Sequence, residues 1–379
     1  MGVARSENTE QGEVQMKMKK RTIGAIAGIA IAISMIAPQA FAQDDLILFN
    51  SGSWLASYSS SSGFGAAAAD DSLGWGATGD KPLIGDINDD GIQDVVLARP
   101  AASYTWYGGH GIDVGGISKF SAGGSALGGW GSATGTPHLG DTNGDGIQDI
   151  ILVDNFNWLS FTSSSAGIGG GAANNGGGFG TSTLGDYPLL GDFNGDGATD
   201  LGVWRSTSGG TFIKPTVGGL FGSGSAPGGS FGNASWAFAA PLVGDINGDG
   251  RDDLLLTADV SGALFWRAAF GQADGSLDLS DQSNQLNWGA TSMDIPMLAD
   301  INGDGMDDVV IRRSGGTYIT SFTGAGGVIG TGPTSSIGWG NSAFTPTFAD
   351  MTVIPEPATL GLFALVGGGM LWFRKRFSI

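Results

Sequence analysis

The chain of 379 residues contains no cysteine. This absence excludes disulfide bonds, thiolate metal sites and a cysteine nucleophile. Basic residues are also scarce, with 17 lysines and arginines against 36 acidic residues and a net charge of −19. A nucleic-acid partner is therefore not expected, because phosphate binding needs a basic surface. Long runs of helix-forming residues are missing between residues 43 and 353, so a helical bundle is not expected either.

Glutamate is absent from the same central region, since Glu7, Glu10, Glu13 and Glu356 all lie nearer the ends. A generally acidic surface would use both acids. A region whose acids are all aspartate indicates short side chains that serve turns and ion ligation. Glycine is abundant instead, at 70 residues, but it follows no strict Gly-X-Y period, which excludes collagen.

The N-terminal segment is typical of a secretory signal peptide. Basic residues at positions 17–21 precede an apolar run at 22–36, and Ala40 and Ala42 form a small-x-small cleavage site. We therefore expect residues 1–42 to be a signal peptide, with 1–15 a candidate for a mis-assigned start. A membrane anchor is the alternative, but the run is shorter than the ~20 residues that a span needs.

The C-terminal segment reads Pro355, Glu356 and Pro357, then an apolar stretch at 358–373, then three basic residues. This order predicts a transmembrane helix over 358–373 whose basic end stays in the cytoplasm. The segment 354–379 resembles the PEP-CTERM sorting signal of Gram-negative bacteria. That resemblance implies a membrane protease, exosortase, as a partner, and transfer to the cell surface, outer membrane or extracellular matrix. Membrane contact would end with processing. A plain C-terminal anchor is the alternative.

One pattern, Asp-x-Asn-x-Asp-Gly-x-x-Asp, occurs five times, and its first aspartates are 51–55 residues apart. An aromatic-Gly pair precedes each copy, and a short apolar run follows it. A fixed period near 50 residues is typical of a propeller or an array. Room for four short strands in each period predicts one propeller blade per repeat.

A sixth repeat is divided between the two ends of the region. Trp339, Pro346 and Asp350 match the first half of a repeat, and Asp44 and Asp45, followed by an apolar run, match the second half. A closed ring would use such a division to remove its open sheet edge. We therefore predict an all-β propeller over residues 43–353, with six four-stranded blades and the last blade closed by both termini. A seven-bladed or irregular ring is the alternative.

The repeated motif places oxygen ligands at positions 1, 3, 5 and 9 and a backbone carbonyl at position 7, with glycine at position 6 for the sharp turn. Hard oxygen donors favour Ca²⁺, up to five structural ions. An EF-hand is not expected, because position 12 is apolar and the loop runs into a strand. The candidate ligands are Asp86, Asn88, Asp90, Ile92 and Asp94; Asp141, Asn143, Asp145, Ile147 and Asp149; Asp192, Asn194, Asp196, Ala198 and Asp200; Asp245, Asn247, Asp249, Arg251 and Asp253; and Asp300, Asn302, Asp304, Met306 and Asp308.

On these motifs, residues 44–352 resemble the FG-GAP/VCBS repeat family, which includes the ring of integrin α chains. The resemblance implies a β-propeller whose loops between strands hold Ca²⁺. Integrin rings have seven blades, whereas the repeats counted here give six.

An enzyme is not expected. His138 stands where other repeats have leucine or methionine, which indicates a strand residue, and His110 lies in a glycine-rich turn without an obvious partner. No nucleophile elbow occurs. A glycosidase would need a pair of carboxylates, but the repeated aspartates already belong to the predicted metal loops.

A binding function rests on the loops that a propeller presents at its two faces. Four in-phase tryptophans could stack on sugars or pack between the blades: Trp54, Trp106, Trp158 and Trp266. We predict a calcium-binding, secreted and surface-sorted module for adhesion or for the extracellular matrix, with an extracellular polysaccharide or surface protein as its partner. The alternatives are a purely structural surface protein and, less favoured, a polysaccharide-acting enzyme.

Overall fold

The computed structural model describes residues 43–121, 124–164, 175–222, 226–279, 285–330 and 332–351. The predicted signal peptide with Ala40 and Ala42, and the predicted sorting segment 354–379 with its Pro-Glu-Pro triplet, lie outside these ranges. Within them, no helix has the length and the apolar character needed to cross a membrane.

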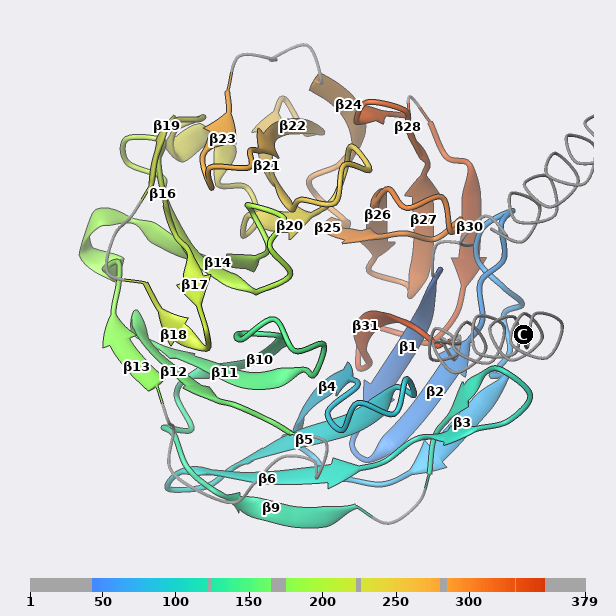
Figure 1. Cartoon of the computed structure of the whole chain (residues 1–379). Helices are drawn as coiled ribbons and strands as arrows, with labels where there is room; N and C mark the ends of the chain where they lie inside the picture. The colour runs from blue at the N-terminus through green and yellow to red at the C-terminus, as the bar shows by residue number, and fades with distance from the viewer. Residues whose placement is uncertain are drawn as a thin grey trace, which may run out of the picture. The chain divides into compact units, whose positions relative to one another are not determined.

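Six antiparallel sheets follow one another around a ring (Figure 1). In each blade the strand that comes first in the repeat borders the central channel, and the fourth strand lies at the rim. The blades comprise β4 (Lys81–Gly85), β5 (Asp94–Pro100), β6 (Tyr104–Gly109) and β9 (Ser125–Gly129); β10 (Thr136–Gly140), β11 (Asp149–Asp154), β12 (Asn157–Phe161) and β13 (Asn175–Gly178); β14 (Asp186–Gly191), β15 (Asp200–Arg205), β16 (Gly210–Lys214) and β19 (Ala226–Ser230); β20 (Leu242–Gly244), β21 (Asp253–Val260), β22 (Ala263–Gly271) and β24 (Gln285–Ala290); β25 (Asp294–Ala299), β26 (Asp308–Arg313), β27 (Thr317–Ser321) and β30 (Ser335–Gly338); and β31 (Thr345–Asp350), β1 (Asp44–Asn50), β2 (Ser53–Ser57) and β3 (Asp71–Gly74). We number them blades one to six in this order.

The last blade is built from both ends of the region. Strand β31 pairs antiparallel with β1, in a register that runs from Asp44 opposite Asp350 to Phe49 opposite Thr345. The pairing leaves no open edge between the first and last repeats. The predicted six-bladed ring, closed by its termini, is confirmed.

Short elements decorate the connections. Within the described residues, three small hairpins join the third and fourth strands of blades one, three and five, and β23 pairs with the end of β22 in blade four. Two single-turn 3₁₀ helices precede the inner strands of blades three and four. These elements are β7 (Ile112–Asp113) with β8 (Ser118–Lys119), β17 (Thr216–Val217) with β18 (Leu220–Phe221), β28 (Thr323–Gly324) with β29 (Val328–Ile329), β23 (Leu277–Asp278), η1 (Ser182–Leu184) and η2 (Ala234–Trp236).

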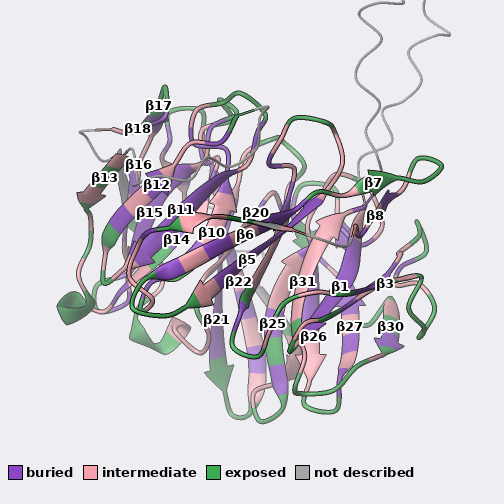
Figure 2. Cartoon of the chain, turned by 90° about the horizontal axis from the view of Figure 1, so that it is seen from below, coloured by how far each residue is buried: buried purple, intermediate pink, exposed green. Residues whose placement is uncertain are grey.

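The core lies between neighbouring blades, where the strands carry buried residues while hairpin tips are exposed (Figure 2). Five fully buried tryptophans anchor it. In each, the indole N–H donates to the carbonyl of an aromatic-Gly pair 21–27 residues away; Trp158, for example, donates to Phe179 at 2.7 Å. A buried indole needs such a partner. The in-phase tryptophans Trp54, Trp106, Trp158 and Trp266 therefore serve packing and offer no platform for a sugar.

Blades one, three and five share an ion pair that the other blades lack in the described ranges. An arginine at the end of the second strand binds an aspartate at the start of the first strand or immediately before it: Arg99 with Asp80, Arg205 with Asp186 and Arg313 with Asp294. The three aspartate side chains are at most 1% exposed. Burial alone would raise the pKa of Asp186, but the hydrogen bonds and charge of Arg205 outweigh it, so this pKa is lowered.

Arg205→Met removes the cation and leaves the Asp186 carboxylate buried without its charge partner. Losing one member of a buried pair costs several kcal/mol, so we expect the free energy of unfolding at pH 7 to fall by about 3 kcal/mol. Denaturant titration measures it. Lys81→Met, at an exposed position, is the matched control and should change stability by less than about 0.5 kcal/mol.

The same pair predicts the direction of a pH effect. Because the folded-state pKa of Asp186 lies below the unfolded value of ~3.9, the pair stabilises the fold above that pH and loses this contribution as the pH falls through the folded pKa. The stability gap between the wild type and Arg205→Met should therefore narrow on acidification below about pH 4. A gap that stays constant down to pH 2.5 would show that the carboxylate is not the source of the effect.

Candidate metal centres

Each of the five repeated motifs forms a tight loop between the first and second strands of its blade, at 86–94, 141–149, 192–200, 245–253 and 300–308. We call these the aspartate loops, one to five. Their first aspartate organises the backbone. In loop three, Asp192 accepts hydrogen bonds from the N–H groups of Gly195 at 2.7 Å and Gly197 at 2.8 Å. The other four loops repeat both bonds at 2.7–2.8 Å.

The glycines of the motif are required by the backbone. Positions 4 and 6 both have positive φ, near 74° and 87° in loops two and three. Glycine adopts this left-handed region without strain. Loop one has Asp89 at position 4, with φ of 64°, and so places a residue with a side chain where the other loops have glycine.

The asparagine at position 3 and the aspartate at position 5 follow in each loop. The position-5 carboxylate accepts the N–H of position 7 at 2.9–3.1 Å, and it is exposed in all five loops. In loops four and five, the side-chain oxygens of Asn247 and Asn302 are buried and accept no hydrogen bond. A buried oxygen without a partner costs stability. A hard cation would satisfy both oxygens.

The aspartate at position 9 has a role that the motif alone did not reveal. Its Oδ1 accepts an N–H from the last residue of the third strand of the same blade or from the connection that follows this strand, at 2.6–2.8 Å in all five loops. In loops one, two, four and five its Oδ2 also accepts the N–H of position 2. These fully buried carboxylates tie each loop to its neighbouring connection.

Burial has a marked electrostatic effect on these groups. It raises the pKa of Asp94 to about 6, of Asp200 to about 7, and of Asp253 and Asp308 to about 8, while backbone hydrogen bonds act in the opposite direction. Carboxylates of the same loop add to the rise in Asp200, Asp253 and Asp308. A bound cation would favour the ionised form of each group.

The structure thus assembles each loop but does not bring all its acids together. Among the described residues, no three acidic or histidine side chains lie close enough to hold a metal ion. Position 1 accepts N–H groups of its own loop, position 5 is exposed, and position 9 is held by the neighbouring connection and, in four loops, by the N–H of position 2. Metal ligation by the predicted residues stays a prediction, and it requires the position-5 and position-9 carboxylates to turn toward position 1.

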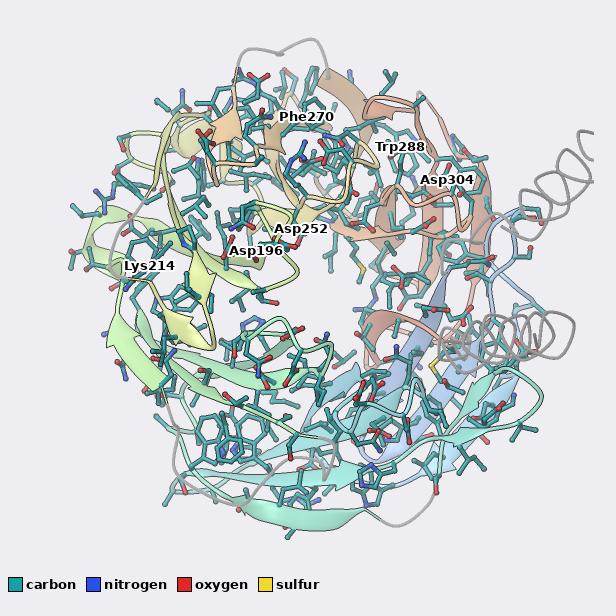
Figure 3. The ribbon with its side chains drawn as sticks, in the orientation of Figure 1. Asp196, Lys214, Asp252, Phe270, Trp288 and Asp304 are labelled. Atoms are coloured by element: carbon teal, nitrogen blue, oxygen red, sulfur yellow. The ribbon has the colours of Figure 1, made fainter. Side chains whose placement is uncertain are left out.

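The aspartate loops also join the blades. The backbone N–H of position 8 donates to the position-1 carbonyl of the preceding blade: Gln148 to Asp86, Thr199 to Asp141, Asp252 to Asp192 and Asp307 to Asp245, at 2.5–2.8 Å. Figure 3 shows Asp196 and Asp252 on the inward side of two successive blades. The loops therefore form a chain of contacts around the channel.

Blade six continues this chain with a divided loop. The chain does not close through position 8 of loop one, because the N–H of Gln93 donates to the Oγ of Ser118 instead. The N–H of Asp44 donates to the carbonyl of Asp300 at 2.7 Å, as a position-8 residue does. Asp45 accepts the N–H groups of Ser59 at 2.6 Å and Met351 at 3.2 Å, as a position-9 residue does. Asp44 and Asp45 therefore take positions 8 and 9 of a loop that Asp350 begins.

His110 has partners that the sequence did not indicate. Its Nδ1 lies 2.9 Å from the Nδ2 of Asn88 and 3.4 Å from the Oδ2 of Asp94, so the ring sits beside loop one. The expectation that His110 has no obvious partner is wrong. Only the fold reveals this contact, because His110 is brought back to the loop by the third strand of the blade.

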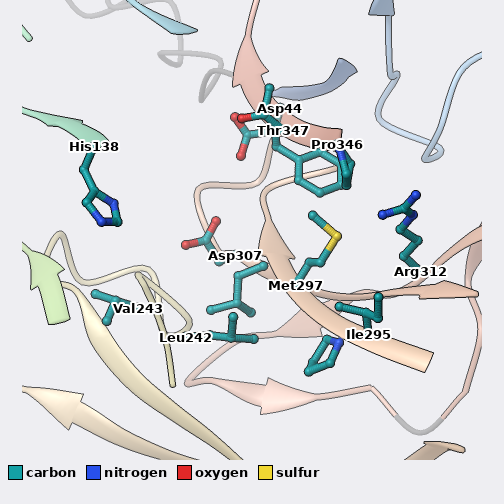
Figure 4. Close-up of a pocket in the computed structure, with 13 residues that line it drawn as sticks. Asp44, His138, Leu242, Val243, Ile295, Met297, Asp307, Arg312, Pro346 and Thr347 are labelled. Atoms are coloured by element: carbon teal, nitrogen blue, oxygen red, sulfur yellow. The ribbon is translucent and has the colours of Figure 1, made fainter. Parts of the chain in front are cut away.

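A central cavity of ≈ 800 Å³ lies in the channel (Figure 4). Its walls are partly apolar, with Met297 and Phe348 among them, and partly polar, with Asp44, Asp307 and Arg312. His138 also lines it, from strand β10. The prediction that His138 is a strand residue is confirmed. Burial lowers the pKa of His138 to about 4, so the ring is neutral at neutral pH.

Asp89→Gly should stabilise the chain, because it replaces the one position-4 side chain that adopts positive φ with the residue found in the other loops. We expect a gain of about 0.5–1 kcal/mol in the free energy of unfolding, measured by denaturant titration in chelator so that ion binding does not contribute. The reverse change, Gly144→Asp, should cost a similar amount. An Asp89→Gly variant that is less stable than the wild type would contradict the strain assigned to the positive φ of Asp89.

Comparison with protein-family models gives no match, and comparison with the sequences of curated proteins gives none either. Solved structures do match. A lectin of Agrocybe aegerita, described as recognising non-reducing terminal N-acetylglucosamine, has a TM-score of 0.52 and 15% identity over 83% of this chain and 96% of its own. A Photorhabdus luminescens Tc holotoxin pore has a TM-score of 0.45 and 15% identity, over 73% of this chain and 14% of its own. A rhamnogalacturonan lyase has a TM-score of 0.32 and 10% identity, over 83% of this chain and 63% of its own. At these identities the lectin shows the propeller fold that the two proteins share.

Proposed function

We propose that the chain is an exported, calcium-stabilised propeller that binds carbohydrate at the cell surface or in the extracellular matrix. The observation that carries the calcium part is the set of five loops in phase, each with an aspartate at positions 1, 5 and 9. Loops four and five add buried asparagine oxygens without a partner. These are hard, neutral or anionic oxygen donors, the set that Ca²⁺ prefers over softer metals.

Calcium would act on stability. Three aspartates in one small loop repel one another, and a divalent cation removes most of that repulsion. Because the position-1 carbonyl of every loop also accepts an N–H from the following blade, an ion in a loop would stiffen a joint of the ring. The exposed position-5 carboxylates leave a path from solvent to each loop.

Carbohydrate is the favoured ligand class because a lectin has the same ring over most of both chains. A neutral partner also suits this chain, whose strongly negative charge disfavours polyanions such as nucleic acids. The face with the aspartate loops carries the additional hairpins, β7–β8, β17–β18 and β28–β29, and loops at one face of a rigid scaffold are a common place for binding residues. Residues of the sugar site are not assigned.

Export and surface sorting rest on the two end segments of the sequence, the signal peptide and the PEP-CTERM-like segment, with an exosortase as the processing partner. A purely structural surface protein is the second candidate. The observation that favours it is the complete burial of the in-phase tryptophans, which removes the aromatic platform on which sugars commonly stack. We propose no enzymatic activity.

Removal of calcium should lower the melting temperature of the mature chain. At an ion concentration a hundred times Kd, each independent filled site adds about 2.7 kcal/mol, so even one such site should shift the midpoint by several degrees. Scanning calorimetry in chelator and then in millimolar Ca²⁺ measures the shift, and Mg²⁺ is the control. Native mass spectrometry counts the ions. A chain that melts identically in both buffers would refute the calcium assignment.

A single-site change tests whether each loop acts by itself. Asp145→Ala removes the position-5 carboxylate of loop two, so we expect the count of bound ions to fall by one while the other sites keep their affinity. Asp154→Ala, at the end of strand β11 in the same blade and outside the loop, is the matched control.

Glycan-array binding by the mature chain separates the two candidate functions. A carbohydrate-binding module should retain a defined set of glycans, and free sugar should displace it. A structural protein should retain none, although its calcium-dependent melting would persist. An array without signal would therefore reject the carbohydrate part alone.

A further inference from the structure

Loop four differs from the other aspartate loops at position 7. That position is Ile92, Ile147, Ala198 and Met306 in loops one, two, three and five, but it is Arg251 in loop four. The predicted ligand at position 7 is a backbone carbonyl, so any side chain is compatible with the motif. An arginine there nevertheless places a permanent positive charge beside a candidate cation site.

The arginine side chain turns back onto its own loop. The Nη2 of Arg251 forms an ion pair with the Oδ2 of Asp249, the position-5 carboxylate, and its Nε donates to the carbonyl of Gly271 at 3.0 Å. The two charged side chains are 26% and 32% exposed. Asp249 is thus the one position-5 carboxylate for which the described residues supply a cationic partner.

The guanidinium is held in place on a second side. Arg251 packs against loop three, where a Cβ added to Gly195 would lie 2.9 Å from the Cγ of Arg251. The arginine stem is therefore confined between two loops, and its charged end is fixed by Asp249 and the carbonyl of Gly271. Packing and these two contacts hold the charge of Arg251 beside the loop.

A separate observation indicates that loop four still has a place for an ion. The side-chain oxygen of Asn247, at position 3 of this loop, is buried and accepts no hydrogen bond. Arg251 reaches Asp249 but does not satisfy this oxygen. Loop four therefore combines oxygen atoms suited to a cation with the guanidinium of Arg251, which is paired with Asp249 and leaves the Asn247 oxygen without a partner.

We propose that Arg251 is a built-in competitor of calcium, which makes loop four the weakest of the five aspartate loops and the last to fill. The proposal rests on the calcium function proposed above. A fixed unit charge about 6 Å from a divalent ion lowers its affinity about tenfold even at the dielectric constant of water. Loss of a free Asp249 carboxylate acts in the same direction. The ring then fills in two stages, four ions first and a fifth at higher calcium.

Neutralising Arg251 tests this. Arg251→Gln removes the charge and keeps an N–H donor for Gly271, and Arg251→Met removes both. Calcium titrations of the full mature chain, followed by isothermal calorimetry and by native mass spectrometry, report the number of ions and their affinities. We expect a wild type with one site about tenfold weaker than the rest, and a gain of about tenfold at that site in both variants.

The reverse change provides the matched control. Met306→Arg places the same charge at position 7 of loop five, so we expect it to create a second weak site and to leave the first unchanged. Melting in chelator checks that each variant folds as the wild type does. Arg251→Gln and Met306→Arg change different loops. If one variant fails to fold, the other still tests whether a positive charge at position 7 weakens calcium binding.

The outcomes are distinct for the two proposals. Five equal sites in the wild type, or a weak site that Arg251→Gln and Arg251→Met leave unchanged, would overturn the role of Arg251 while the calcium function stands. A wild type that binds no ion at millimolar calcium would overturn the calcium function and this inference with it. A gain of affinity confined to one site in the Arg251 variants supports both.

Discussion

A backbone hydrogen bond from position 8 of one loop to position 1 of the preceding loop joins five of the six pairs of neighbouring blades. A different bond, from the N–H of Ser118 to the carbonyl of Met351, links blade one to blade six. Neighbouring blades also meet through packed apolar side chains, which are less directional than hydrogen bonds in setting the register between one sheet and the next. The position-8 hydrogen bond fixes that register at the channel end of these five pairs of blades. Because position 1 also accepts the N–H groups of its own loop, loop shape and ring geometry are set by the same residue.

This arrangement explains why the central region uses aspartate and no glutamate. At position 1 the carboxylate must reach N–H groups three and five residues ahead, and at position 9 it must reach two backbone segments from inside a strand. The short side chain of aspartate makes both contacts with little loss of conformational entropy. A longer glutamate would project the carboxylate beyond them.

The sequence predicts the ring well because the fold is repetitive. The period of 51–55 residues, the divided sixth repeat and the apolar runs together give the number of blades, the place of each loop and the closure by both termini. In contrast, the link from Asp252 to Asp192 joins residues 60 positions apart, and no local pattern marks it. The contact between His110 and Asn88 is hidden for the same reason.

The three arginine–aspartate pairs, in contrast, do have a pattern in the sequence. In each of the three arginine–aspartate pairs the two residues are 19 positions apart, and the pairs occur in every second repeat. A search for opposite charges at a fixed spacing would have found them. A carboxylate at position 9 can act as a metal ligand or as a hydrogen-bond acceptor that joins two backbone segments. The spacing of the motif does not distinguish these two roles, because both need the same residue at the same position.

The antiparallel pairing of β1 with β31 has a mechanical consequence. Since Asp44 lies opposite Asp350, the chain enters and leaves the ring at the same end of one strand pair. A pulling force between the two ends would peel these strands apart one hydrogen bond at a time, rather than shear all their bonds together. Tension between the two ends would open the ring at blade six by separating β1 from β31, while a load carried by one end alone would not stress the pairing of these strands.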